Sequence, residues 1–112
     1  MTPPIPDVIG AALTTSAADL FTVPAGQTRH ILQVQACNVD GAHEVDVTLQ
    51  WTDASNSDAV TRLAYQLTVA AKDARTLLAG PMALREGDKL QALASADNAA
   101  EVTITFFDED AV

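Results

Sequence analysis

Strict alternation of apolar and polar side chains over residues 44–53 (EVDVTLQWTD) constrains the fold more than any other feature of this chain. A period of two places one set of side chains on a core face and the other in water, which indicates a half-buried β-strand. The inward set is Val45, Val47, Leu49 and Trp51, and the outward set is Glu44, Asp46, Thr48, Gln50 and Thr52. The run EVTITFF at residues 101–107 alternates in the same way and predicts a second strand of this kind.

A third alternating segment covers residues 28–39. Its core face would carry Leu32, Val34 and Ala36, and its other face Gln33, Gln35 and Cys37. Asp40-Gly41 follows, a tight-turn signal because glycine tolerates a positive φ. The sequence therefore predicts an antiparallel hairpin between residues 28–39 and 44–53.

Shorter apolar runs bounded by turn-forming residues predict the remaining strands. They cover residues 8–13, 19–23, 60–67, 74–79 and 89–95. About eight short strands with turns at intervals of roughly 8–12 residues are typical of a β-sandwich. The expected fold is all-β, an antiparallel β-sandwich of jelly-roll type.

One segment, residues 70–79 (AAKDARTLLA), is compatible with either a helix or a strand. Its apolar spacing fits a helical face, and Gly80-Pro81 would end a helix there. However, TVPAGQTRHIL at residues 22–32 aligns without a gap with TVAAKDARTLL at residues 68–78. This internal similarity suggests two similar strand–turn–strand halves, so we favour a strand at residues 74–79.

Length and proline placement give the domain organisation. A chain of 112 residues has the length of one domain, which we place at residues 8–112. Residues 1–7 contain Pro3, Pro4 and Pro6, and proline fixes φ and lacks an N–H. We therefore expect an extended N-terminal arm, which is either a frayed terminus or a segment laid on a neighbouring subunit.

The charge and composition exclude several functional classes. Fifteen acidic and six basic residues give a net charge of −9, which argues against a nucleic-acid partner. The apolar runs are too short for a membrane helix, and MTPPIPD does not resemble a secretory signal, so we expect no membrane association. Cys37 is the single cysteine, and the apolar content is rich in alanine, so neighbouring subunits are expected to add stability.

No arrangement of residues predicts an enzyme, a metal site or a cofactor. His30 and Cys37 are seven residues apart on one strand, hence about 23 Å apart and on opposite faces. His43 is expected to be a solvated turn residue and Cys37 a small half-buried one. The loop at residues 53–58 has acidic residues, but Asp58 stands where an EF-hand needs glycine and Ala64 where it needs glutamate. A polar hairpin loop is the favoured interpretation of that segment.

Two aromatic residues are candidates for contacts with other molecules. Trp51 could stack on a sugar, but its place on the apolar face favours core packing. Phe107 is out of register with the inward residues of its strand and should point away from the core. It would pack under a loop or the arm, or anchor a subunit contact.

Three turn motifs in order resemble a known class of proteins. They are DLFTVPAG at residues 19–26, ACNVDG at residues 36–41 and LREGDKL at residues 84–90. Across residues 19–107 the pattern resembles small β-sandwich virion proteins of tailed bacteriophages and gene-transfer particles. The resemblance implies a non-enzymatic, symmetric protein of a capsid, neck or fibre, without catalytic residues.

We therefore expect a virion structural protein, foremost a capsid decoration or accessory protein, assembled in the cytoplasm of a bacterial host. It would form a homo-oligomer and attach to other virion proteins such as a major capsid protein. The alternative is a tail- or fibre-associated module that binds a carbohydrate or receptor. The candidate interface residues are Pro3, Pro4, Ile5, Pro6 and Phe107.

Overall fold

Eight β-strands and one turn of 3-10 helix make up the fold in a computed structural model that describes residues 5–111. The helical turn, η1, covers Ala54–Asn56. The strands are β1 (Asp7–Ala12), β2 (Ala18–Thr22), β3 (Gln27–Asn38), β4 (Val45–Asp53), β5 (Ala59–Val69), β6 (Ala74–Leu84), β7 (Lys89–Ala94) and β8 (Ala100–Asp110). Residues 74–79 thus lie in a strand, as predicted; residues 70–73 form the turn before it, and the strand continues to Leu84.

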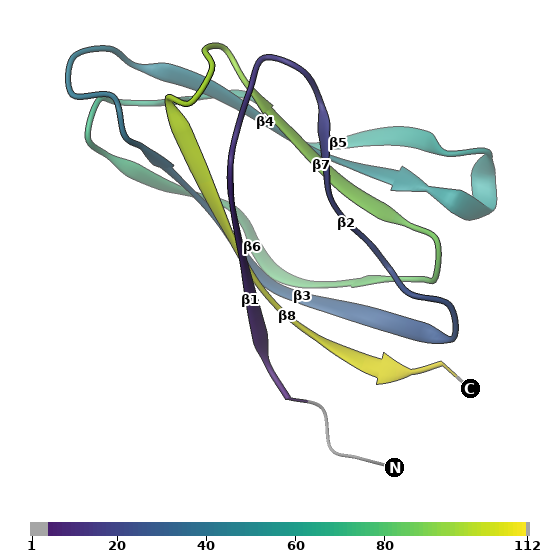
Figure 1. The fold of residues 1–112 in the computed structure, drawn as a ribbon. Helices are drawn as coiled ribbons and strands as arrows, with labels where there is room; N and C mark the ends of the chain where they lie inside the picture. Colours follow the sequence, from purple (N-terminus) through teal and green to yellow (C-terminus); the bar gives the residue numbers. More distant parts are fainter. Residues whose placement is uncertain (1–4, 112) are drawn as a thin grey trace.

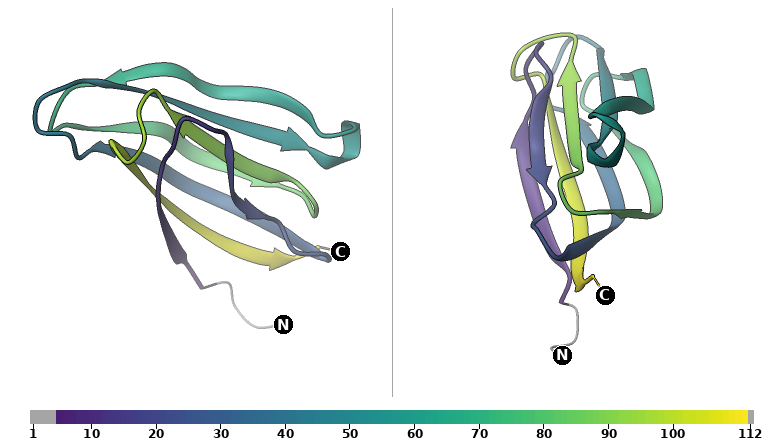
Figure 2. Two further views of the ribbon diagram at one scale, coloured as in Figure 1. Left: turned by 45° about the horizontal axis from the view of Figure 1, so that its top comes forward. Right: turned by 90° about the vertical axis from the view of Figure 1, so that its right-hand side faces the viewer.

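The strands form two four-stranded antiparallel sheets that pack face to face (Figures 1 and 2). Sheet A has the order β1-β8-β3-β6, and sheet B has the order β2-β7-β4-β5. Within residues 5–111, β4 and β5 are the only consecutive strands that share a sheet, and every other connection crosses between the sheets. This arrangement is a jelly roll, so the predicted fold class is confirmed.

The predicted hairpin between residues 28–39 and 44–53 is wrong, because β3 belongs to sheet A and β4 to sheet B. The buried side chain of Asn38 redirects the chain between them. Its Nδ2 donates to the carbonyl oxygens of His43 (2.9 Å) and Val69 (3.0 Å), and its Oδ1 accepts from the Asp40 amide (2.8 Å). The turn signal at Asp40-Gly41 therefore marks a crossover between sheets.

A β-bulge at Leu32 changes the inward face of β3. The register with both β6 and β8 shifts between Ile31 and Gln33. Ile31 and Val34 are both fully buried, whereas Leu32 is 38% exposed. The prediction that Leu32 faces the core is therefore wrong, although Val34 and Ala36 do face it. Gly80 on β6 lies against this bulge, where an added Cβ would be 2.5 Å from the Leu32 carbonyl oxygen.

The apolar core fills the space between the two sheets. Its fully buried larger side chains include Ile31, Val47, Leu49, Leu90 and Ile104, and five buried alanines pack with them. The inward residues predicted for residues 101–107 (Val102, Ile104 and Phe106) are all buried. None of the helices in residues 5–111 has the length and apolar character that crossing a membrane requires.

The outward face of β4 is buried as well, which corrects the prediction that it lies in water. Thr48, Gln50 and Thr52 are only 6%, 8% and 5% exposed, respectively. β4 lies in the interior of sheet B, where β5 and β7 flank it and provide polar partners. Gln50 Nε2 donates to Gln91 Oε1 (2.8 Å), and Thr48 Oγ1 accepts from the Gln66 amide (3.1 Å).

The internal similarity between residues 22–32 and 68–78 corresponds to one turn used twice. In the first copy the Gln27 amide donates to the Pro24 carbonyl (3.2 Å), and in the second the Asp73 amide donates to the Ala70 carbonyl (3.0 Å). The equivalent turn residues, Gly26 and Lys72, both have positive φ (77° and 65°). Both turns lead from sheet B to sheet A, as expected for two similar halves.

Candidate functional site: the outer face of sheet A and the loops beside it

The outer face of sheet A presents a regular array of small and uncharged side chains. Pairing across the four strands aligns the outward positions in rows. The rows are Val8–Thr105–Gln33–Ala79, Gly10–Thr103–Gln35–Thr76 and Ala12–Glu101–Cys37–Ala74, with Phe107–His30–Ala83 beyond the first. Within the part of the chain that the structure describes, the carboxylates of this face lie towards its two ends: Glu101 is in one end row, and Glu109, which pairs with Thr28, follows Phe107 at the other end.

Phe107 belongs to this face, so the prediction that it points away from the core is confirmed. Its ring stacks on the imidazole of His30 with 4.6 Å between ring centroids. His30 Nε2 lies 3.2 Å from Glu109 Oε1. Phe107 is thereby half-buried against the neighbouring strand.

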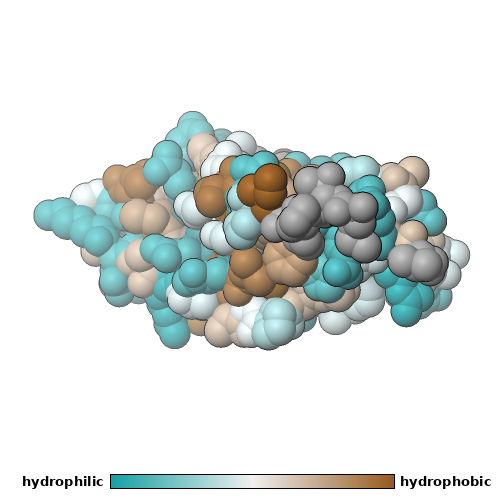
Figure 3. All heavy atoms as spheres, turned by 90° about the horizontal axis from the view of Figure 1, so that it is seen from below, coloured by the Kyte–Doolittle hydropathy of each residue, from teal (hydrophilic) through white to brown (hydrophobic). Residues whose placement is uncertain are grey.

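Of the other candidate interface residues, Ile5 and Pro6 immediately precede β1. Ile5 is 75% exposed, and Pro6 is also exposed. Pro3 and Pro4 lie outside the residues that the structure describes. Figure 3 shows the molecule from below, the side on which sheet A lies in Figure 1, and hydrophobic side chains gather near the middle of this view.

The outer face of sheet B differs in carrying both signs of charge. Gln91 links Gln50 to Asp19 by donating to the Asp19 carboxylate (2.7 Å), and Lys89 Nζ lies 3.5 Å from the same carboxylate. The Gln91 hydrogen bond and the Lys89 charge lower the pKa of Asp19 below its usual value. The side chains on this face therefore pair largely with one another.

Sequence reasoning missed an exposed aromatic residue at the edge of sheet B. Tyr65 on β5 is 64% exposed, and the Arg62 guanidinium lies 5.7 Å from the centroid of its ring. The β4–β5 register shifts between Leu49 and its neighbours, and Gln66 has a positive φ of 49°. This irregularity breaks the alternation on which a strand prediction depends, so no pattern in residues 60–67 indicated Tyr65.

Arg29 and Asp108 form an ion pair inside one end of the sandwich. The Arg29 guanidinium donates to both carboxylate oxygens of Asp108, at 2.6 and 2.8 Å. It also lies near the rings of Phe21 and Phe106, at 4.7 and 4.1 Å from their centroids. The Arg29 hydrogen bonds hold the pKa of Asp108 below its usual value, although partial burial opposes this.

Two of the turn motifs noted in the sequence meet at the same end of the sandwich. The Val23 amide donates to the Asp88 carbonyl (2.9 Å), and the Gly87 amide donates to the Val23 carbonyl (3.0 Å). Glu86 Oε2 accepts from the Gly26 amide (3.0 Å). VPAG and REGD are therefore paired parts of one joint between the sheets.

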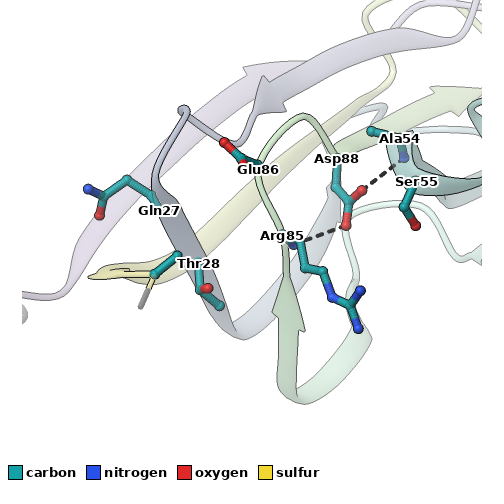
Figure 4. A pocket seen from close by; sticks show the side chains of 8 residues that line it. Gln27, Thr28, Ala54, Ser55, Arg85, Glu86 and Asp88 are labelled. Carbon is teal, nitrogen blue, oxygen red and sulfur yellow. Dashed lines mark hydrogen bonds between the residues drawn. The ribbon is translucent and has the colours of Figure 1, made fainter.

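An open cleft of about 490 Å³ lies beside this joint (Figure 4). Its lining residues are Gln27, Thr28, Ala54, Ser55, Arg85, Glu86, Asp88 and Ala111. The buried carboxylate of Asp88 accepts from the amides of Ala54 (2.9 Å) and Arg85 (3.0 Å), as the dashed lines in Figure 4 show. Both oxygens of Asp88 thus hold loops together.

Trp51 packs against the core, as the sequence analysis favoured. Its ring is half-buried at a second cleft of about 180 Å³ that also contacts Asp53 and Arg85. The indole Nε1 is buried and has no hydrogen-bond partner among the residues that the structure describes. This position does not present the indole as an open stacking platform.

The titratable residues considered in the sequence analysis remain apart. Within residues 5–111, no three His, Cys, Asp or Glu side chains gather as a metal site would need. The His43 side chain is 81% exposed and lies 3.3 Å from Asp40, as expected for a turn residue, and Cys37 is half-buried. Because of the bulge at Leu32, His30 and Cys37 share the outer face of sheet A, which corrects their predicted placement on opposite faces.

The acidic loop at residues 53–58 is a capped helical turn. Asp53 Oδ1 accepts from the Ser55 amide (3.0 Å) and the Ser55 hydroxyl (2.6 Å), which caps η1. The Asp40 carboxylate has a comparable part in its own turn, where the Ala42 amide donates to it and lowers its pKa.

Comparison with known proteins finds solved structures that share the fold. No family model and no curated protein matches the chain. A protein of the disulfide-linked pili of Bacillus endospore appendages is 14% identical with a TM-score of 0.59, covering 98% of this chain and 88% of that chain. A protein of the capsid of Helicobacter pylori bacteriophage KHP30 is 12% identical with a TM-score of 0.56, covering 98% of this chain and 95% of that one. The Drosophila NLP core is 14% identical with a TM-score of 0.55, covering 93% and 99%. At these identities the likeness establishes the fold.

Proposed function

We propose that this chain is a non-enzymatic structural protein of a phage-like virion, which attaches as an oligomer to the surface of the capsid. The observation that carries the proposal is the match to the phage capsid protein over 98% of this chain and 95% of that one. The two proteins thus share one jelly-roll unit of similar size. Two of the three turn motifs add support, because VPAG and REGD form one joint of this fold.

The distribution of charge suits a protein that accumulates before it assembles. A net charge of −9 on 112 residues keeps a protein soluble at high copy number. The outer face of sheet A combines this overall charge with a broad surface whose described carboxylates, Glu101 and Glu109, lie towards its ends. Attachment to a repeating lattice through several weak contacts would then provide stable binding by avidity.

Particle composition tests the proposal. The chain, carrying a small C-terminal tag, is expressed with its flanking genes, and particles are purified on a density gradient and analysed by quantitative mass spectrometry. We expect the chain to co-sediment with particles in a fixed ratio to the major capsid protein. A chain that stays at the top of the gradient while complete particles form would refute the virion role.

The position on the particle distinguishes decoration from the alternative at a tail or fibre. Electron cryomicroscopy of the same particles should place the domain on the capsid lattice. Density confined to the tail or a fibre tip would refute capsid decoration. No feature of Trp51 favours a carbohydrate module, because its ring packs against the core.

A further inference from the structure

We propose that the outer face of sheet A is the surface through which one copy of this chain binds a second copy. This inference deepens the proposed function, on which it rests, by naming the contact surface and the partner. The surface comprises the outward positions of β1, β8, β3 and β6 described above.

The charge distribution favours a second copy over other partners. Two copies with a net charge of −9 each repel one another, so a stable contact must keep carboxylates out of its buried centre. In the two central rows of this face, all eight described positions are uncharged. A basic protein or a nucleic acid would gain nothing from such a face, because an attraction between opposite charges needs a charged surface.

The chemistry of the central rows also suits self-association. Gln33 and Gln35 each carry an amide that both donates and accepts hydrogen bonds, and Thr103 and Thr105 carry hydroxyl groups that do the same. In a two-fold symmetric contact the same patch meets itself, so groups of this kind can always find a complementary partner. Small neighbours on the edge strands, such as Gly10 and Ala79, allow close approach.

The dimensions of the face approach those of a specific interface. β3 has 12 residues, which at about 3.3 Å per residue gives a length of about 40 Å. Four strands at a spacing of about 4.8 Å give a width of about 19 Å, and because β1 has only 6 residues the area of the face is about 600 Å². A standard protein interface buries about 800 Å² on each partner.

The outer face of sheet B lacks these properties. Its positions include Asp46, Asp19, Lys89 and Arg62. The central polar groups already bond to one another through Gln91. A contact at this face would bury charges of both signs and break internal hydrogen bonds.

Isosteric changes from glutamine to glutamate test the proposal, because each adds one negative charge and little else. Gln33→Glu and Gln35→Glu introduce the charge in the central rows of sheet A, and Gln66→Glu introduces it at an exposed position of sheet B. Sedimentation velocity and native mass spectrometry of the isolated chain measure self-association over a concentration series. Circular dichroism and thermal unfolding of every variant verify that the fold is retained.

We expect the wild type and Gln66→Glu to associate equally, and Gln33→Glu and Gln35→Glu to dissociate with a Kd at least about tenfold higher. High salt should recover part of this loss, because it screens the added charges. A thiol reagent offers a second readout: Cys37, at the end of the face, should react more slowly in the wild-type oligomer than in Gln35→Glu.

Three results would overturn the proposal: a wild type that is monomeric up to millimolar concentration, equal association of all variants, or an equal loss in Gln66→Glu. These results differ from failure of the proposed function, which particle composition decides. A chain found in particles but monomeric in isolation would leave the virion role standing and remove this contact surface.

Discussion

Arg29 on β3 and Asp108 on β8 are joined by two parallel hydrogen bonds, 2.6 and 2.8 Å long, although Arg29 points into the sandwich. The Arg29 side chain is 9% exposed, and that of Asp108 is 29% exposed. The pair therefore places a cation among aromatic rings at the end of the core, where the carboxylate compensates its charge.

Replacing Arg29 should destabilise the domain strongly. Arg29→Ala leaves Asp108 without its partner and opens space between Phe21 and Phe106, so the free energy of unfolding should fall by about 3 kcal/mol. Urea denaturation measures the change. The control, Arg62→Ala, removes an exposed arginine and should alter stability by no more than about 0.5 kcal/mol. Equal effects of the two substitutions would contradict this assignment.

The same pair predicts a specific dependence of stability on pH. The pKa of Asp108 is lowered in the folded state, so the ionised carboxylate stabilises the fold above the unfolded-state pKa, about 3.9. This stabilisation is lost as the pH falls through the folded-state pKa. The difference in unfolding free energy between wild type and Asp108→Asn should therefore be constant near pH 7 and shrink below about pH 4. A difference unchanged down to pH 2 would argue against the ion pair.

Asp88 should be essential for the joint between the turn motifs. It is 3% exposed, and its carboxylate accepts from the Ala54 and Arg85 amides. Asp88→Ala leaves both amides without this acceptor and should lower the free energy of unfolding by about 2–3 kcal/mol. Glu44→Ala, at an exposed position, is the control and should have little effect. Chemical denaturation of both variants provides the comparison, and a loss below about 0.5 kcal/mol for Asp88→Ala would refute the role.

Two glycines in sheet A should respond oppositely to alanine. A Cβ on Gly80 would lie 2.5 and 2.6 Å from the carbonyl oxygens of Leu32 and Ile31, so Gly80→Ala must displace the bulge and should cost about 1–3 kcal/mol. A Cβ on Gly10 would meet its nearest neighbour, the Val102 carbonyl, at 3.9 Å. Gly10→Ala should be neutral or stabilising by up to about 1 kcal/mol. Thermal unfolding would contradict this if both changes had the same sign and size.

The fluorescence of Trp51 should report the burial of its ring and should not respond to sugars. Its fluorescence emission should be blue-shifted in the folded chain relative to the unfolded chain, because the ring packs against the core. Addition of mono- or oligosaccharides should leave the spectrum unchanged. A saturable change in the fluorescence spectrum with any sugar would support the carbohydrate-binding alternative.

Strand positions could be predicted from the sequence because alternation depends on local residues. The predicted strands at residues 28–39, 44–53 and 101–107 correspond to β3, β4 and β8. Alternation, however, indicates only that one face of a strand is buried. It does not indicate to which of the two sheets the strand belongs. The sequence pattern therefore predicts one hairpin for β3 and β4, whereas the contacts of Asn38 direct the chain to the opposite sheet.

The remaining differences arise from bulges and from position within a sheet. The bulge at Leu32 changes which side chains of β3 face the core, and the irregularity near Gln66 exposes Tyr65. The local sequence pattern indicates neither of these irregularities. Thr48 and Gln50 are buried because β4 is flanked on both sides, a property that depends on topology. The candidate face of sheet A likewise becomes visible only when residues from four strands are aligned.

The place of β8 between β1 and β3 has a consequence for synthesis on the ribosome. Neither β1 nor β3 can pair with β8 until β8 has left the exit tunnel, so sheet A cannot be completed before that point. The hairpin of β4 and β5, whose strands are adjacent along the chain, is available long before this point. In nascent chains the edges of β1 and β3 that pair with β8 should therefore stay unpaired until β8 has been synthesised. Sheet A should then be completed in one late step.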